Sequence, residues 1–200
     1  MAPGVETTDT VIACLNSLGC VFIILSYVIF PSLRVFSGHV SLFLAISGLG
    51  TALCLYVGVL QDEPLLCKYQ AFGFIYFANV TIATTSYISY ILYIVFVGKM
   101  RSSEKVKVSG KIAVSIWLLP LLLAGLPLMF NKYHEHTSVN MCWIHSDGHG
   151  ETLTLLLQLA CFYAPICVAM IYNMRTFLAL LPHFHIEMVS VALPLISASD

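Results

Sequence analysis

Residues 71–97 read AFGFIYFANVTIATTSYISYILYIVFV, a run of 27 residues without a single charged side chain. A helix needs about 20 mostly apolar residues to cross the hydrocarbon core of a bilayer, so this run is long enough to span a membrane. Hydroxyl and amide side chains recur along it, among them Asn79, Thr81 and Thr84. Because small polar groups of this kind bond between helices in lipid, the run predicts a central helix of a membrane-embedded bundle.

The composition of the whole chain also indicates that a bilayer is its solvent. Of the 200 residues, 59% are hydrophobic and 10% are charged, and the mean hydropathy is +0.91. A soluble domain carries roughly a quarter charged residues, which excludes a soluble globular protein. The formal net charge of -1 gives no overall attraction for nucleic-acid phosphates. The apolar content is also far too high for a disordered chain.

Five apolar stretches, separated by polar or helix-breaking segments, predict five transmembrane helices and an all-α membrane protein. They lie at about 10–30, 39–60, 71–97, 111–130 and 152–174. Residues 176–200 do not continue the pattern, because Pro182 and Glu187 interrupt two short apolar pieces. We expect this segment to be an atypical interfacial or unstructured tail, with a poorly inserting sixth span as the alternative.

The basic residues fall mainly on one side of the predicted bundle. Alternating the five spans places seven Lys and Arg on one side and only Lys68 and Lys132 on the other, which accounts for all nine. Basic flanks are retained in the cytoplasm, so the N-terminus is predicted outside, in the plasma membrane. The predicted inner set is Arg34, Lys99, Arg101, Lys105, Lys107, Lys111 and Arg175.

Two of the seven cysteines lie at the outer surface in this topology. Cys67 precedes the third span, and Cys142 lies in the long loop between the fourth and fifth spans. Exposed thiols seldom stay reduced in an oxidising compartment, so we expect a disulfide between them, with two free thiols as the alternative. The other cysteines are expected to pack as small apolar residues within the spans. These are Cys14, Cys20, Cys54, Cys161 and Cys167.

No motif predicts a catalytic, cofactor or metal site. The chain contains no CxxC, HExxH, GxSxG or GxxxxGK pattern, and these are signatures of zinc or redox sites, metalloproteases, serine hydrolases and nucleotide-binding loops. The loop histidines, such as His134, His136 and His145, lack a spacing specific for a metal and are interpreted as solvated. We therefore expect no enzyme activity and no cofactor.

Several short motifs, in order along the chain, resemble one receptor family. They are Ser17-Leu18-Gly19-Cys20 through Ser26-Tyr27, Phe30-Pro31-Ser32-Leu33-Arg34, Leu44-Ala45-Ile46-Ser47, Cys67-Lys68-Tyr69-Gln70-Ala71-Phe72, Met141-Cys142-Trp143-Ile144, and Phe162-Tyr163-Ala164-Pro165 with Tyr172-Asn173. Over about residues 10–175 the chain is similar to the cyclic-AMP-receptor-like G-protein-coupled receptors of slime moulds, which also resemble the secretin and adhesion group. Gly48 departs from the family, which commonly has an Asp at this place.

The resemblance implies a receptor that binds an extracellular small-molecule ligand and signals to a heterotrimeric G protein. It also implies the disulfide between the third helix and the second outer loop. From their place near the outer side, we expect ligand-facing roles for Gln70, Tyr76 and Trp143, with packing between helices as the alternative for the third-span residues. The side facing the G protein would carry a set of basic residues whose alternative role is to determine topology. These residues are Arg34, Lys99, Arg101, Lys105 and Lys107.

The family has seven helices, so residues 1–175 are interpreted as a partial receptor domain, truncated after the fifth helix. We expect such a chain not to couple a ligand to a G protein alone, and to associate with itself or with a larger receptor. The residues leave two other functions open. One is a small oligomeric transporter or channel subunit, whose polar pore would be lined by the hydroxyl groups of the third span. The other is a regulatory fragment that pairs with a full-length receptor.

Overall fold

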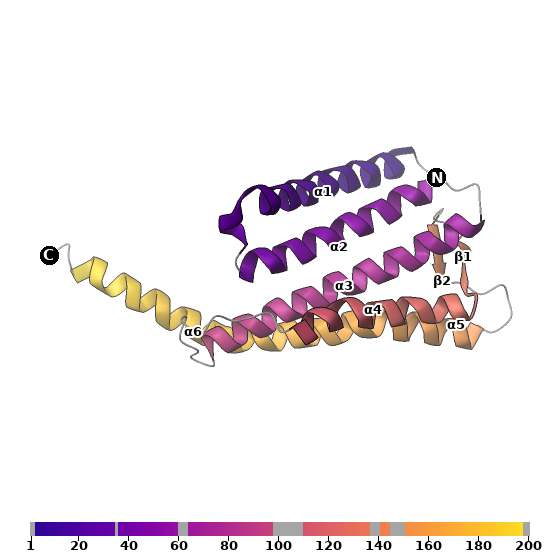
Figure 1. The fold of residues 1–200 in the computed structure, drawn as a ribbon. Coiled ribbons are helices and arrows are strands. Elements are labelled where there is room, and N and C mark those ends of the chain that lie inside the picture. The colour runs from indigo at the N-terminus through magenta and orange to yellow at the C-terminus, as the bar shows by residue number, and fades with distance from the viewer. Residues whose placement is uncertain are drawn as a thin grey trace.

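The computed structural model describes residues 3–34, 36–59, 64–97, 110–136, 141–144 and 151–197, and most of them are helical. Helices α1 and α2 form an antiparallel pair joined by a short 3-10 helix, η1 (Figure 1). Helices α3 and α4 follow, and then a hairpin of two antiparallel strands. The first part of the chain thus comprises α1 (Pro3–Ile29), η1 (Pro31–Leu33), α2 (Phe36–Val59), α3 (Pro64–Phe96), α4 (Gly110–Met129), β1 (Tyr133–His136) and β2 (Met141–Ile144).

The last part of the chain is one long helical rod with a change of winding inside it. It consists of α5 (Glu151–Gln158), the π-helical segment η2 (Leu159–Tyr163) and α6 (Ala164–Ser197). In Figure 1 this rod lies beside α3 and α4, and its C-terminal end projects beyond the other helices. We call the end of the bundle that carries the strands the hairpin end, and the opposite end, where α1 meets α2, the η1 end.

α3 is the central element of the bundle. It contacts α2, α4 and α6, and both strands of the hairpin contact it as well. One buried cluster lies near the hairpin and includes Ala71, Ile75 and Tyr133. A second cluster lies further along α3 and includes Val80 and Tyr87. α3 thus occupies the central position that the sequence predicts, and neighbouring helices shelter its polar groups on several sides.

The apolar helices confirm the predicted fold class, an all-α membrane protein with a receptor-type bundle. Within the described ranges, four helical stretches are long and apolar enough to cross a membrane, and the apolar part of α4, Val114–Met129, is shorter. The four longer stretches are Val11–Ile29, Gly38–Tyr56, Leu65–Phe96 and Glu151–Pro182.

The final helix is longer than hydropathy predicts. The apolar pattern predicts an end near residue 174, but α6 continues to Ser197 and passes through Pro182. Thr176 and Leu180 lie beyond the expected end and are buried in the bundle. A proline inside a helix removes one backbone hydrogen bond and leaves the remainder in place, and packing of the preceding turns supports the helix here. Residues 176–197 are thus helical, which excludes an unstructured segment there, while the interfacial tail and the sixth span stay predictions.

α2 and α3 approach each other closely at two glycines. A Cβ atom on Gly73 would lie 2.5 Å from Cys54 Sγ, and a Cβ atom on Gly50 would lie 2.6 Å from the ring of Phe77. Both distances are shorter than van der Waals contact, so each glycine makes room for a side chain of the facing helix. Small residues permit this kind of approach between helices in membranes, and the two contacts set the spacing between α2 and α3.

Candidate functional site

The hairpin is joined covalently to the first turns of α3. Cys67 on α3 and Cys142 on β2 form a disulfide, with their Cα atoms 5.3 Å apart and a separation of 75 positions in sequence. Both cysteines are buried. The predicted disulfide is therefore present, and it fixes the position of β2 relative to the central helix.

Two glutamine side chains hold β2 by its backbone. The N–H of Cys142 donates to Gln70 Oε1 at 3.3 Å. Gln158 Nε2, at the end of α5, donates to the carbonyl of Ile144 at 2.6 Å. Because a backbone group left unpaired away from water is costly, these amides tie the strand to α3 and to α5 at once.

The first strand is anchored to α4 through Tyr133. Its buried hydroxyl donates to the carbonyl of Ala124 at 2.8 Å, and burial, with a smaller contribution from Cys161, raises the pKa of Tyr133. Asn131, which follows α4, has a φ of 52°, a left-handed conformation that asparagine adopts readily at helix ends. Lys68 Nζ donates to Asn131 Oδ1 at 2.7 Å, so α3 also holds this turn.

Three half-buried rings from three different elements meet under the hairpin. The ring centroid of Trp143 on β2 lies 4.9 Å from that of Phe162 in η2 and 6.0 Å from that of Phe74 on α3. Phe74 and Phe162 are 6.5 Å apart. We call Phe74, Trp143 and Phe162 the aromatic cluster. Such a cluster offers flat apolar surface to another aromatic or apolar group.

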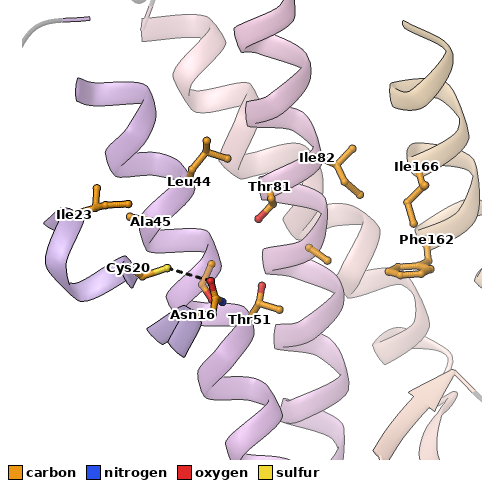
Figure 2. A pocket seen from close by; sticks show the side chains of 12 residues that line it. Asn16, Cys20, Ile23, Leu44, Ala45, Thr51, Thr81, Ile82, Phe162 and Ile166 are labelled. Atoms are coloured by element: carbon orange, nitrogen blue, oxygen red, sulfur yellow. Dashed lines mark hydrogen bonds between the residues drawn. The ribbon is translucent and has the colours of Figure 1, made fainter. Parts of the chain in front are cut away.

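A cavity of about 540 Å³ adjoins this cluster through Phe162. Figure 2 shows its walls, which come from α1, α2, α3 and the long helical rod. The lining is mostly apolar, and its polar members include Asn16, Thr51 and Thr81. Asn16 Nδ2 donates to the carbonyl of Gly48 at 3.4 Å. The cavity therefore offers an apolar space with a few hydrogen-bonding groups, which come from α1, α2 and α3.

The three residues predicted to face a ligand lie in different surroundings. Trp143 belongs to the aromatic cluster. Gln70 is buried and bound to the backbone of β2. Tyr76 is half-buried and points toward α4, with its ring centroid 6.4 Å from that of Trp117. The structure thus places only Trp143 of these three next to the cavity wall formed by Phe162.

Sequence reasoning did not single out Phe74 and Phe162 as site residues. Phe162 stands in the Phe162-Tyr163-Ala164-Pro165 motif. The proline of this motif marks an irregular place in the helix, but the motif does not indicate which rings Phe162 contacts. Contacts among rings from α3, β2 and η2 depend on how these elements pack, and no local pattern contains that information.

At the η1 end, Arg34 has a local structural role. Arg34 Nη2 donates to the carbonyl of Val28 at 2.9 Å and so caps the last turn of α1. Nearby, the Tyr27 hydroxyl and His39 Nδ1 are 2.8 Å apart and hydrogen-bonded. Lys99, Arg101, Lys105 and Lys107, the other residues predicted to face a G protein, lie outside the described residues.

The hydroxyl groups of α3 are used for packing. Thr84 is fully buried, and its Oγ1 donates to the carbonyl of Val80 at 2.8 Å. Thr81 Oγ1 lies 2.9 Å from Ser47 Oγ on α2 and forms an interhelical hydrogen bond. These groups therefore bond to backbone and to a neighbouring helix, which is the role expected of small polar residues in lipid.

Comparison with known proteins agrees with this architecture. Residues 19–187 match the family model described as "7 transmembrane receptor (rhodopsin family)". Over 180 residues the chain is 26% identical to "Cyclic AMP receptor-like protein A" of Dictyostelium discoideum, which covers 88% of this chain and 45% of that protein. It is 25% identical to "G-protein coupled receptor 1" of Arabidopsis thaliana over 173 residues, covering 86% of this chain and 50% of that protein.

A solved structure shares the fold. Squid rhodopsin superposes with a TM-score of 0.71 at 18% sequence identity, over 93% of this chain and 54% of that chain. The chain thus spans about half the length of the relatives it matches. Because the family model covers most of the chain, and because the apolar helices and the fold agree with it, this integral membrane protein belongs to the rhodopsin-type seven-transmembrane receptor family.

Proposed function

We propose that the chain acts in a receptor of the plasma membrane, with its N-terminus and its hairpin end outside, where a small molecule binds. The disulfide carries this proposal, since such bonds form and persist on the oxidising side of a membrane. It fixes β2 over α3 and brings Trp143 to Phe74 and Phe162. A ligand bound at this end would therefore contact elements that are fixed to the central helix α3.

The chemistry of the aromatic cluster favours a ligand with a flat or apolar group. Stacking and edge contacts with aromatic rings contribute about 0.5 to 1.5 kcal/mol per pair beyond burial. Of the two lysines at the hairpin end, Lys68 already donates to Asn131. Recognition by rings and amides therefore suits this site better than recognition of several phosphates.

A finer family assignment is also a proposal. We infer that the chain is related to the cyclic-AMP-receptor-like group and, through it, to the secretin and adhesion receptors. The Dictyostelium relative of that name supports the first relation. Cyclic AMP, which carries one flat base and one phosphate, is accordingly the first ligand to test.

The two tryptophans of the chain make a direct binding test. In a Trp117→Phe variant, Trp143 is the only tryptophan, and its emission should change saturably when cyclic AMP is added to the protein in lipid vesicles. In the matched Trp143→Phe variant, Trp117 is the only tryptophan and should not respond, because it packs against Phe43 and Tyr76 away from the cluster. Equal responses of both variants would contradict a site at the hairpin end.

Signalling to a G protein is tested in membranes of the cells that produce the protein, because the chain alone in vesicles is not expected to couple. We expect a heterotrimeric G protein to exchange GDP for GTP faster when the chain is present in its native membrane assembly. Substitution of the basic residues Lys99, Arg101, Lys105 and Lys107 by Gln should reduce that rate if the side they occupy faces the G protein. Exchange that is independent of the chain would contradict the proposed function.

A further inference from the structure

One flank of α1 borders the cavity of about 540 Å³. α1 packs mainly on α2 and η1, and Asn16 and Ile23 lie on its cavity flank, opposite Phe162 and Ile166 of the long helical rod (Figure 2). Ile12 lies one helical turn before Asn16 on the same face of α1 and is 60% exposed. The cavity therefore separates this flank of α1 from the rod.

Asn16 is an exposed amide inside an apolar helical stretch, Val11–Ile29. An amide group has two N–H donors and two oxygen lone pairs. Asn16 Nδ2 donates to the Gly48 carbonyl at 3.4 Å, and Asn16 Oδ1 accepts from Cys20 Sγ at 3.8 Å. Both distances are long, and a thiol is a weak donor. Within the described part of the chain, Asn16 thus keeps one N–H and one lone pair for a further partner.

The chemistry of the cavity favours a protein helix as its occupant. Acyl chains of lipids carry no hydrogen-bonding group that could satisfy the Asn16 amide at the depth of a membrane span. Thr51, on the wall formed by α2, donates its hydroxyl hydrogen to the Ser47 carbonyl at 3.0 Å, which leaves the hydroxyl oxygen as an acceptor. The occupant should therefore be a mostly apolar helix face that carries one group able both to donate and to accept.

A second copy of this chain has such a face. In a pair related by a two-fold axis perpendicular to the membrane, equivalent residues lie at the same depth and can meet at the axis. Two Asn16 side chains can then form a reciprocal pair, in which Nδ2 of each copy donates to Oδ1 of the other. The same contact would cover Ile12, the exposed apolar residue beside Asn16.

We propose that two copies of this chain associate through the cavity flank of α1, with α1 of each copy covering the cavity of the other. Asn16 determines the specificity of this contact, because hydrogen bonds between polar side chains promote helix association in lipid. A helix of a longer receptor is the alternative occupant. The association requires neither a ligand nor a G protein, so it is independent of the proposed function.

Cysteine cross-linking in lipid vesicles locates the interface. The parent chain carries Cys14→Ala and Cys167→Ala, which removes the two exposed thiols. A cysteine is then placed at Ile12 or at Leu18, which are 60% and 67% exposed. Position 18 lies on the opposite side of the helix from Asn16, because two residues correspond to about 200° of rotation. We expect an oxidant to cross-link two copies of the Ile12→Cys chain several-fold faster than two copies of the Leu18→Cys chain.

Substitutions of Asn16 test the amide pair itself. Energy transfer between donor-labelled and acceptor-labelled chains, diluted stepwise in lipid, gives the dissociation constant of the dimer. Asn16→Leu should raise this constant about tenfold, the effect of losing interhelical amide bonds in lipid, whereas Asn16→Gln, which keeps the amide, should raise it less. Ser115→Leu, which removes an exposed hydroxyl of α4, is the matched control and should leave the constant unchanged. The thermal unfolding midpoint of each variant shows whether it is folded.

Three results would overturn the proposal. They are a chain that stays monomeric in lipid, equal cross-linking rates at positions 12 and 18, and a folded Asn16→Leu variant that associates as tightly as the wild-type chain. In cells, cross-linking of the Ile12→Cys chain to a longer receptor instead of to itself would also overturn self-association, and it would assign the cavity to a helix of that receptor.

Discussion

The two ends of the bundle are held together by different kinds of interaction. At the hairpin end, a disulfide, two glutamine amides and the aromatic cluster connect β2 to α3, α5 and η2. At the η1 end, the polar contacts that the structure describes are single hydrogen bonds, such as that between Tyr27 and His39, and they lie beside a buried apolar cluster that includes Val40 and Tyr87. The disulfide and the ring contacts therefore fix the geometry of the hairpin end, whereas single hydrogen bonds at the η1 end can be exchanged for others at a lower cost.

Loss of the disulfide should have the largest effect. A sequence separation of 75 between the two cysteines predicts a loss of roughly 4 kcal/mol in the chain-entropy model. Cys67→Ser should therefore lower the thermal unfolding midpoint in detergent strongly and reduce the amount of protein at the cell surface. Cys14→Ser, at an exposed free thiol, is the control. If the unfolding midpoint of the wild-type protein does not fall when a reductant is added, the disulfide does not stabilise the hairpin end.

Glycine substitutions compare the packing of the two ends. Gly73→Ala would bring a Cβ atom to 2.5 Å from the movable Cys54 side chain, whereas Gly38→Ala, at the η1 end, would meet the backbone carbonyl of Leu33. Overpacking costs about 1 to 3 kcal/mol, and we expect the Gly38 variant to be the more destabilised of the two. Gly19→Ala, which has open space around it, should be neutral. A second substitution, Cys54→Ala, should rescue Gly73→Ala.

The phenol of Tyr133 gives the hairpin end a dependence on pH. Burial raises its pKa in the folded protein, while an unfolded tyrosine titrates near about 10. Stability from this group is therefore complete below about pH 10 and is lost as the pH rises above that value. Tyr133→Phe should cost about 1 kcal/mol at neutral pH and should flatten the fall in unfolding midpoint at high pH. An identical fall in both proteins would show that other groups cause it.

The smallest effect is expected at the η1 end. Arg34→Ala removes the side chain that caps α1 through the Val28 carbonyl, and a cation at a helix C-terminus is worth about 0.3 to 1 kcal/mol. The unfolding midpoint should fall slightly and should be less sensitive to salt. Arg175→Ala, on the exposed face of α6, serves as the comparison. A loss as large as that of Cys67→Ser would refute the contrast between the two ends.

The sequence was sufficient to predict those features that depend on composition or on which side of the membrane a residue lies. The apolar runs predicted the helices, and the topology placed Cys67 and Cys142 together. The end of the last helix was missed because Pro182 and Glu187 count against insertion in a sum over residues, although packing of Thr176 and Leu180 carries the helix onward.

The aromatic cluster and η2 could not be predicted for a different reason. Residues 152–174 are apolar on nearly every face, so the π-helical segment η2 leaves no trace in the hydropathy pattern. Pro165 marks a lost hydrogen bond, but the partner that replaces it, Asn79, lies 82 residues away in sequence from Cys161. Only the packed structure brings them together.

The bond between Cys67 and Cys142 closes a ring of polypeptide that contains the remainder of α3, all of α4 and β1. A protease that cuts the chain once anywhere inside this ring leaves both pieces attached to each other. The nicked protein would then migrate as one species on a gel until it is reduced, and the whole hairpin would stay tethered to the central helix.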